Sequence, residues 1–198
     1  MDVIQLEREK PKPEFNFKDA RTSGKVIFET DDLVIGYSKD KPLSKPMNLR
    51  MERGDKIAIT GTNGKTTTTA LTGEIMKNYF KDVRVVGNIG IPYTSMVTGS
   101  TGETVTVAEI SSFQLETIDT FKPHVSAILN ITPDHLNRHH TMENYIRAKE
   151  DITKNQTADD YCVLNYEDEV LRDFAAECPA KVIFFSSRSE LSELSLIH

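Results

Sequence analysis

This 198-residue chain has few cysteines, no excess of positive charge and no long apolar run. Its two cysteines, Cys162 and Cys178, form neither a Cys-x-x-Cys pair nor a disulfide framework, which is typical of a reducing compartment. The net charge of −6 leaves no basic footprint, so charge does not indicate nucleic-acid binding. No apolar run approaches the roughly 20 residues of a membrane span, and no secretion signal opens the chain. We therefore expect a cytoplasmic protein with no nucleic-acid partner and no membrane span.

The length suits one domain, or one domain with an appendage, and is enough to bury a core. Residues 1–24 are polar and charged, so we expect a linker or disordered arm there. Residues 25–59 contain short strand-like runs, at 25–30 and 33–37, before an apolar run enters a glycine-containing turn. The main domain is expected at 60–191, followed by a tail at 192–198.

From residue 56 onward, strand-like and helix-like patterns alternate along the chain. The predicted strands are 56–60, 83–88, 104–108, 125–131, 161–165 and 181–185, and the predicted helices are 65–80, 112–119, 141–154 and 167–176. Alternation of this kind predicts an α/β fold, with a mostly parallel sheet and helices on both faces. Polar candidates cluster just past the strand carboxyl ends, where open α/β sheets bind ligands.

The turn after the strand at 56–60 has the composition of a phosphate-binding loop. Glycines let backbone amides point at an anion, and the following helix start adds positive potential. Lys65 would reach the β/γ-phosphates and the Thr66 hydroxyl would reach Mg²⁺. The strict pattern has a glycine where this chain has Ile59, so the loop is a shortened variant; the alternative is a Gly-Asn turn before a surface helix. The candidate nucleotide-binding residues are Gly61, Thr62, Asn63, Gly64, Lys65, Thr66 and Thr67.

Two further candidates for metal binding stand at or beyond predicted strand ends. Glu109 closes the strand at 104–108 and can hold Mg²⁺ directly or through water, although a strand-end glutamate is usually only solvated. His135 lies in a histidine-rich stretch, 130–140, four residues before His139. That spacing suits a zinc pair on a helix, but Pro133 indicates a loop or helix start. We favour one histidine assisting a phosphate-bound Mg²⁺.

Lys149 is expected on the inward face of the helix at 141–154, which Thr141 would cap. Tyr145, Ala148, Lys149 and Ile152 follow helical spacing and form one stripe. One interpretation is a lysine that buries its stem and extends its amine to water. The other is a lysine placed in the site, modified so that it presents oxygens to a metal.

The front of the chain resembles one family and the rest resembles another. "LVIGY" and "PLSKPMNLRMERGDKIAI" resemble the ABC-F family of ATP-binding cassette proteins, a match that ends near residue 59. In that family an aromatic residue near Tyr37 stacks on adenine; a tyrosine packed at a strand end is the alternative. The cassette signature Leu-Ser-Gly-Gly does not follow, so the segment does not predict a cassette ATPase.

From residue 60 to about 191, five separate motifs resemble the central ATP-binding domain of the Mur ligases. They are "TGTNGKTTTTALTGEI", "GNIGIPY", "EISSFQLE", "LNITPDHLNRH" and "YIRAKEDI", and they resemble in particular the members that add D-glutamate. The resemblance implies a peptidoglycan-forming ligase that uses ATP and Mg²⁺. ATP would phosphorylate the carboxylate of UDP-N-acetylmuramoyl-L-alanine, and the D-glutamate amine would attack the acyl phosphate.

The resemblance also implies roles for individual residues. Thr66 and Glu109 would serve one Mg²⁺, and His135 with a carbamylated Lys149 would serve a second. Lys65, His135 and Lys149 would be catalytic, and Asn88, Ser111 and Gln114 would contact the substrate.

A full Mur ligase has three domains, so we expect an incomplete enzyme and a chimera joined near 59–61. The alternatives are a Mg–ATP-binding module without turnover and a non-functional fusion of the two fragments. Folylpolyglutamate synthetase is the enzymatic alternative within the superfamily.

Overall fold

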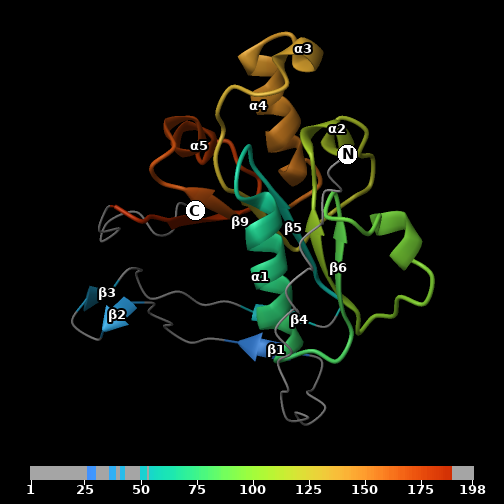
Figure 1. Cartoon of the computed structure of the whole chain (residues 1–198). Coiled ribbons are helices and arrows are strands. Elements are labelled where there is room, and N and C mark those ends of the chain that lie inside the picture. Colours follow the sequence, from blue (N-terminus) through green and yellow to red (C-terminus); the bar gives the residue numbers. More distant parts are fainter. Residues whose placement is uncertain (1–25, 30–35, 39–40, 43–49, 53, 189–198) are drawn as a thin grey trace, which may run out of the picture.

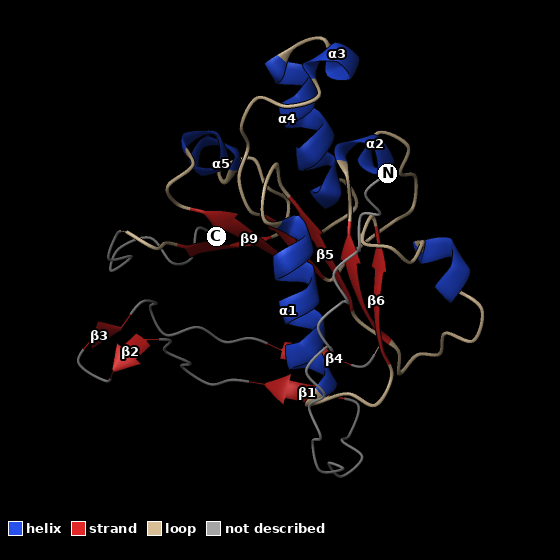
Figure 2. Cartoon of the chain, viewed as in Figure 1, coloured by secondary structure: helices blue, strands red, loops and turns tan. Residues whose placement is uncertain are grey.

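A six-stranded parallel sheet forms the centre of the computed structural model (Figures 1 and 2). The structure describes residues 26–29, 36–38, 41–42, 50–52 and 54–188, and side chains only from Gly54 onward. The strand order is β10-β9-β8-β5-β7-β6, and every ladder in this sheet is parallel. The strands are β5 (Lys56–Thr60), β6 (Val83–Gly87), β7 (Val105–Glu109), β8 (Val125–Ile128), β9 (Tyr161–Asn165) and β10 (Lys181–Phe185). The predicted α/β class is confirmed.

Five α-helices and two 3₁₀ turns connect these strands in the described part of the chain. They are α1 (Lys65–Lys77), η1 (Tyr93–Met96), α2 (Ser112–Leu115), α3 (Leu136–His139), α4 (Met142–Glu150), η2 (Asp151–Thr153) and α5 (Glu169–Phe174). Thr141 caps α4 as predicted, because its side chain accepts a hydrogen bond from the Asn144 amide. Asp168 caps α5 in the same way. The short elements η1 and α3 were not predicted.

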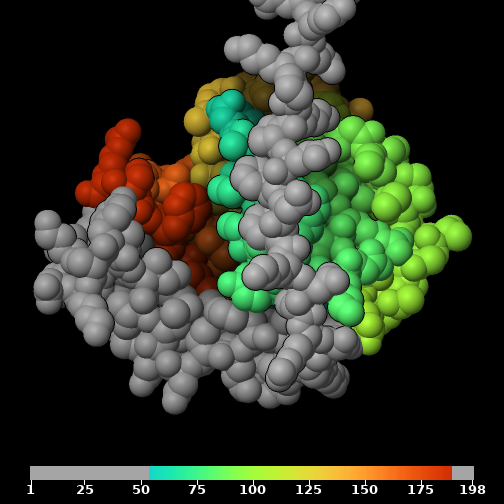
Figure 3. All heavy atoms as spheres, turned by 60° about the horizontal axis from the view of Figure 1, so that its bottom comes forward, coloured from blue at the N-terminus to red at the C-terminus, as the bar shows by residue number. Residues whose placement is uncertain are grey.

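Helices cover both faces of the sheet, as the alternation of strands and helices along the chain predicts. Ile57 and Ile59 of β5 pack with Phe80, three residues beyond the end of α1, in one apolar cluster. Ala58, between them, belongs to a second cluster that includes Leu115 of α2 and Tyr145 of α4. Successive strand residues therefore face opposite helix layers. Figure 3 shows one face of the molecule, with the red residues near the C-terminal end of the described chain at the left and green residues at the right.

The strand order puts the predicted phosphate loop at a reversal point of the sheet. The chain leaves the central strand β5 through α1 to the edge strand β6, returns to β7, and then crosses to β8 on the other side of β5. In open α/β sheets, ligands bind at the carboxyl ends of strands where the order reverses. The loop after β5 lies at this point.

The described residues before Gly54 form two small antiparallel strand pairs. β1 (Val26–Glu29) pairs with β4 (Arg50–Glu52), and β2 (Gly36–Ser38) pairs with β3 (Lys41–Pro42). A strand within 25–30 is confirmed, whereas the predicted strand at 33–37 overlaps β2 only at its end. The linker at 1–24, the tail at 192–198 and the side chain of Tyr37 lie outside the described residues. Within the described ranges, no helix has the length and apolarity needed to cross a bilayer.

Gly87 permits a close approach of β6 to β7 at the edge where the candidate site lies. Its φ is +103°, and a Cβ there would lie 2.1 Å from the Glu109 carbonyl oxygen. Gly87→Ala should therefore lower the free energy of unfolding by roughly 1–3 kcal/mol, measured by urea denaturation. The control is Gly102→Ala, because a Cβ at Gly102 meets nothing within 4 Å. Equal stabilities for the two variants would contradict this account.

Candidate functional site

The loop after β5 presents open backbone amides at the start of a 13-residue helix. Gly64 is the N-cap of α1, has φ 79°, and provides no side-chain cap. The amides of the first turn are therefore not capped by a side chain, the arrangement that suits an anion. Lys65 folds back over the loop, where its Nζ donates to the Thr62 carbonyl at 2.7 Å. Thr67 is exposed on the first turn of α1.

Asn130, just beyond β8, fixes the shape of this loop. Its Oδ1 accepts from the amides of Thr62 and Asn63, at 3.1 and 2.8 Å, and its Nδ2 donates to the Asn63 carbonyl at 3.0 Å. The Thr62 amide also donates to the Asn130 carbonyl, at 2.9 Å. Sequence reasoning missed Asn130 as a site residue, although its place at a strand carboxyl end was a usable signal.

Helix α4 holds the same loop from another side. The Tyr145 hydroxyl lies 3.0 Å from the Thr62 Oγ1, which donates to the Thr132 carbonyl at 3.1 Å. Lys149 is 2 % exposed, and its Nζ donates to the Gly61 carbonyl at 2.8 Å. Of the two interpretations of Lys149, the structure supports the one that places its amine at the loop, since the amine does not extend to water.

Burial gives Lys149 an unusual protonation equilibrium. Loss of hydration, together with repulsion from Lys65, lowers its pKa to about 8. The Nζ also lies 4.8 Å from the centre of the Tyr145 ring, a favourable cation–π position. A larger share of neutral amine is therefore present near pH 7 than for an ordinary lysine.

Glu109, Thr66 and Asn88 meet at the carboxyl ends of β6 and β7. The Thr66 hydroxyl donates to Glu109 Oε2 at 2.8 Å, and Asn88 Nδ2 donates to Oε1 at 3.0 Å. Glu109 is 2 % exposed, and within residues 54–188 no ion pair is recorded for its carboxylate. A buried carboxylate with only neutral donors favours a cation beside it, and oxygen ligands suit Mg²⁺.

Among the described residues, no hydrogen bond joins His135 to Lys149, and the two side chains have different partners. His135 Nε2 lies 3.4 Å from Asp134 Oδ2. The His135 ring packs on the Phe113 ring, with 4.9 Å between the ring centroids. His139 is buried and bonds to Ser112 instead, so the two histidines that a zinc pair would use have different partners. Among the residues the structure describes, no group of three or more His, Cys, Asp or Glu side chains is arranged to hold a metal.

Ser111 and Gln114 bond to each other at the start of α2. Gln114 Oε1 accepts from the Ser111 amide at 2.9 Å, and Ser111 Oγ accepts from the Gln114 amide at 3.3 Å, which forms a capping box. This gives both residues a local structural role and fixes them close to Glu109, which ends the preceding strand.

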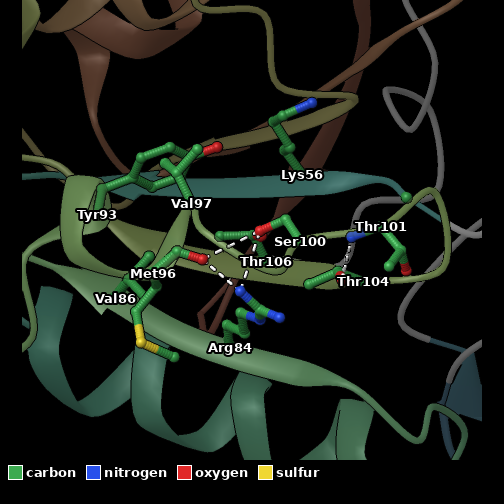
Figure 4. A pocket seen from close by; sticks show the side chains of 11 residues that line it. Lys56, Arg84, Val86, Tyr93, Met96, Val97, Ser100, Thr101, Thr104 and Thr106 are labelled. Carbon is green, nitrogen blue, oxygen red and sulfur yellow. Dashed lines mark hydrogen bonds between the residues drawn. The ribbon is translucent and has the colours of Figure 1, made fainter.

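A cavity of about 200 Å³ lies beneath η1, at the other end of the strands from the loop (Figure 4). Arg84 anchors the segment above it by donating to the carbonyls of Met96 and Gly99 and pairing with Asp82. None of the predicted site residues lines this cavity. Its lining is Gly54, Lys56, Arg84, Val86, Tyr93, Met96, Val97, Ser100, Thr101, Thr104 and Thr106.

The loop and its partners lie in a region that matches a known protein family. Residues 59–196 match the family model described as the Mur ligase middle domain. The chain belongs to the Mur ligase family. The match begins in β5 and includes the phosphate loop, Glu109, the histidine-rich stretch and Lys149.

Curated Mur ligases give the same result at higher similarity. The UDP-N-acetylmuramoylalanine–D-glutamate ligase of Lachnoclostridium phytofermentans is 67 % identical over 191 residues, which are 96 % of this chain and 39 % of that protein. The ligase of the same name from Clostridioides difficile is 49 % identical over 183 residues, covering 83 % of this chain and 41 % of that protein. The chain thus spans about two fifths of the length of these relatives.

Solved Mur ligase structures share the fold. The MurF ligase from Thermotoga maritima in complex with ADP aligns with a TM-score of 0.57 at 23 % identity, over 69 % of this chain and 34 % of that one. MurF from Acinetobacter baumannii aligns with a TM-score of 0.53 at 23 % identity, over 66 % and 30 %. These likenesses confirm the architecture of the Mur ligase middle domain.

Asn130 offers a direct test of how the loop is held. Asn130→Ala removes two acceptor bonds and one donor bond, so we expect weaker Mg–ATP binding by about tenfold, measured by calorimetry. Asn137→Ala, on an exposed side chain of α3, is the control and should leave the affinity unchanged. Unchanged affinity in a folded Asn130→Ala protein would show that the loop keeps its shape without this side chain.

Proposed function

We propose that this chain is the nucleotide-binding part of an ATP-dependent ligase that joins D-glutamate to UDP-N-acetylmuramoyl-L-alanine. The observation that supports this most is the meeting of Thr66, Asn88 and Glu109 beside an uncapped helix N-terminus. The names of the two curated relatives supply the substrates. We also propose a cytoplasmic location, because Cys162 and Cys178 are both free thiols, as is typical of a reducing compartment.

The reaction would pass through an acyl phosphate. The acceptor carboxylate attacks the γ-phosphorus of ATP, the P–O bond to ADP breaks, and the D-glutamate amine then displaces phosphate to form the amide. Lys65 and the loop amides would bind the β/γ-phosphates and offset their growing charge. Asn88, Ser111 and Gln114 would contact the acceptor.

The residues present fit a Mg²⁺ ion at the first of the two proposed positions. Glu109 and Thr66 would hold it together with phosphate oxygens, since Mg²⁺ in nucleotide sites commonly takes one or two protein ligands. For the second position, His135 and a carbamylated Lys149 are the proposed ligands. Bound Mg²⁺ would neutralise charge between the phosphates and the acceptor carboxylate.

A Mg–ATP-binding module without turnover is the second candidate. The separation of His135, which pairs with Asp134, from Lys149, which bonds to Gly61, favours it. A non-functional fusion is the remaining possibility that we proposed from the sequence.

The ABC-F-like character of residues 1–59 and a junction near 59–61 also remain proposals. The alignment with the Lachnoclostridium relative covers 96 % of the chain, so it extends into residues before 60. A junction near 59–61 would therefore fall inside the region that aligns with this one relative.

Thermal melting of the whole chain, with and without Mg–ATP, tests nucleotide binding. A ligand that binds only the folded state adds about 2.7 kcal/mol at a hundred times its Kd. We expect a raised melting temperature that is lost in Lys65→Ala and kept in the exposed Lys77→Ala control. ATP-dependent amide formation from UDP-N-acetylmuramoyl-L-alanine and D-glutamate separates the ligase from the binding module. A cooperative melt without any shift would contradict both.

Carbamylation of Lys149 has its own test. With a pKa of about 8, roughly a tenth of its amine is neutral at pH 7, compared with fewer than about one in a thousand for an ordinary lysine. The neutral amine attacks CO₂, a C–N bond forms, and one proton is released. In ¹³C-labelled bicarbonate we expect a carbamate carbon signal that grows from pH 7 to 8.5.

Two variants show whether that signal belongs to Lys149. Lys149→Met should abolish it, whereas Lys154→Met, at an exposed residue just beyond η2, should keep it. A signal that persists in folded Lys149→Met would assign the carbamate to another lysine and overturn the proposal.

A further inference from the structure

Three side chains outside the predicted site, Ser112, His139 and Glu116, form a polar array between α2 and α3. His139 Nε2 lies 3.0 Å from the Ser112 hydroxyl, and His139 Nδ1 lies 3.1 Å from Glu116 Oε1. Ser112 and His139 are 3 % and 4 % exposed. Arg138 holds the other oxygen of Glu116, at 2.6 Å, and so keeps that carboxylate in place.

The order serine, histidine, carboxylate is that of a nucleophilic triad, and the distances fit one. Burial decides against that role, because a substrate cannot approach a serine hydroxyl that is 3 % exposed. The same hydrogen bonds instead hold two helices together. They join the first residue of α2, Ser112, and its C-cap, Glu116, to the last residue of α3.

The segment that His139 anchors is conformationally strained. His135 and His140, which flank α3, have φ values of 51° and 67°. Residues other than glycine in such conformations cost of order 1–3 kcal/mol and persist when the surroundings hold them. His139 supplies that hold through its ring, and its carbonyl accepts from Asn144 Nδ2 at 2.9 Å.

The array also reaches the phosphate loop. The His139 ring packs on the Tyr145 ring, with 5.1 Å between the ring centroids. The Tyr145 hydroxyl in turn bonds to the Thr62 hydroxyl. The His139 ring also stacks on the ring of Phe113, the residue before Gln114, with 5.6 Å between the ring centroids. One imidazole therefore touches the helix that would bind the acceptor and the helix that braces the nucleotide loop.

We propose that His139 is a positioning residue that fixes α2 and the His135 loop relative to the phosphate loop. This rests on the proposed function, in which Ser111 and Gln114 contact the acceptor. The neutral form with a proton on Nδ1 fits the partners: Nδ1–H donates to Glu116, and Nε2 accepts from the Ser112 hydroxyl.

The surroundings favour this neutral form. Burial lowers the pKa of His139, and it outweighs the opposing effect of Glu116. The other charged or titratable groups that act on the ring are Arg138, His135 and Lys149, each of which also lowers that pKa when it is positively charged.

The test uses four variants of the whole chain. His139→Phe keeps a ring and removes both hydrogen bonds. His139→Asn places its amide near Nδ1 and can keep the Glu116 bond, while His139→Gln places its amide near Nε2 and can keep the Ser112 bond. His140→Asn is the control, since the exposed neighbour lies outside the array and asparagine tolerates a positive φ.

Three measurements follow: ¹⁵N NMR of the His139 ring, hydrogen exchange of the amides of 135–140, and calorimetric binding of Mg–ATP and of UDP-N-acetylmuramoyl-L-alanine. We expect the Nδ1–H form at pH 7 in the parent chain. In His139→Phe we expect exchange about tenfold faster and acceptor binding about tenfold weaker, with Mg–ATP affinity within about twofold. The Asn and Gln variants should recover part of both losses, and His140→Asn should match the parent.

An Nε2–H form, or unchanged exchange in a folded His139→Phe, would overturn the proposal. So would equal losses of Mg–ATP and acceptor affinity, because a general loss of stability gives that result. If His139→Phe does not fold, the Asn and Gln variants decide by the same exchange criterion. If the parent binds no acceptor, the proposed function fails, while the ring tautomer and the exchange rates still decide whether His139 anchors the loop.

Discussion

The shape of the loop between β5 and α1 depends on side chains from segments much later in the chain. Glycines give that loop freedom, so its backbone has no regular pattern of its own to hold it. Asn130, Tyr145 and Lys149 supply the missing bonds, each to a backbone or side-chain atom of Gly61, Thr62 or Asn63. A loop ordered in this way can present its amides to an anion without first losing conformational entropy.

Charge is distributed unevenly around this loop. Two lysines, Lys65 and Lys149, lie close enough to affect each other, and a buried carboxylate, Glu109, lies at the end of β7. The lysines favour an anion and the glutamate favours a cation. A nucleotide carrying Mg²⁺ presents both signs at once, so it would complement the lysines and the glutamate together.

The order and type of the larger elements could be predicted because they depend on local pattern. The predicted stripe of Tyr145, Ala148, Lys149 and Ile152 reappears as a buried face that runs from α4 into η2. Strand order could not be predicted, since it depends on contacts between distant segments. The short elements η1 and α3 also escaped prediction.

The candidate site divides in the same way. Thr66 and Glu109 were expected together and are joined by a hydrogen bond. Asn130 was missed, because its partners lie more than sixty residues earlier in the chain. Strand β8 ends at Ile128, before the predicted 131, since the following residues leave the sheet: Asn130 turns to the loop, and the Ile131 amide donates to Asp168. The pattern of apolar residues along the sequence does not indicate where a strand leaves its sheet.

The contact between Lys149 and Gly61 has a chemical consequence. An ammonium group carries three N–H bonds, and the described structure uses one of them to hold the carbonyl of Gly61. A carbamate nitrogen retains one N–H. The bond that fixes the loop can therefore survive the change of the lysine from cation to anion, so that one side chain can reverse its charge without releasing the backbone it supports.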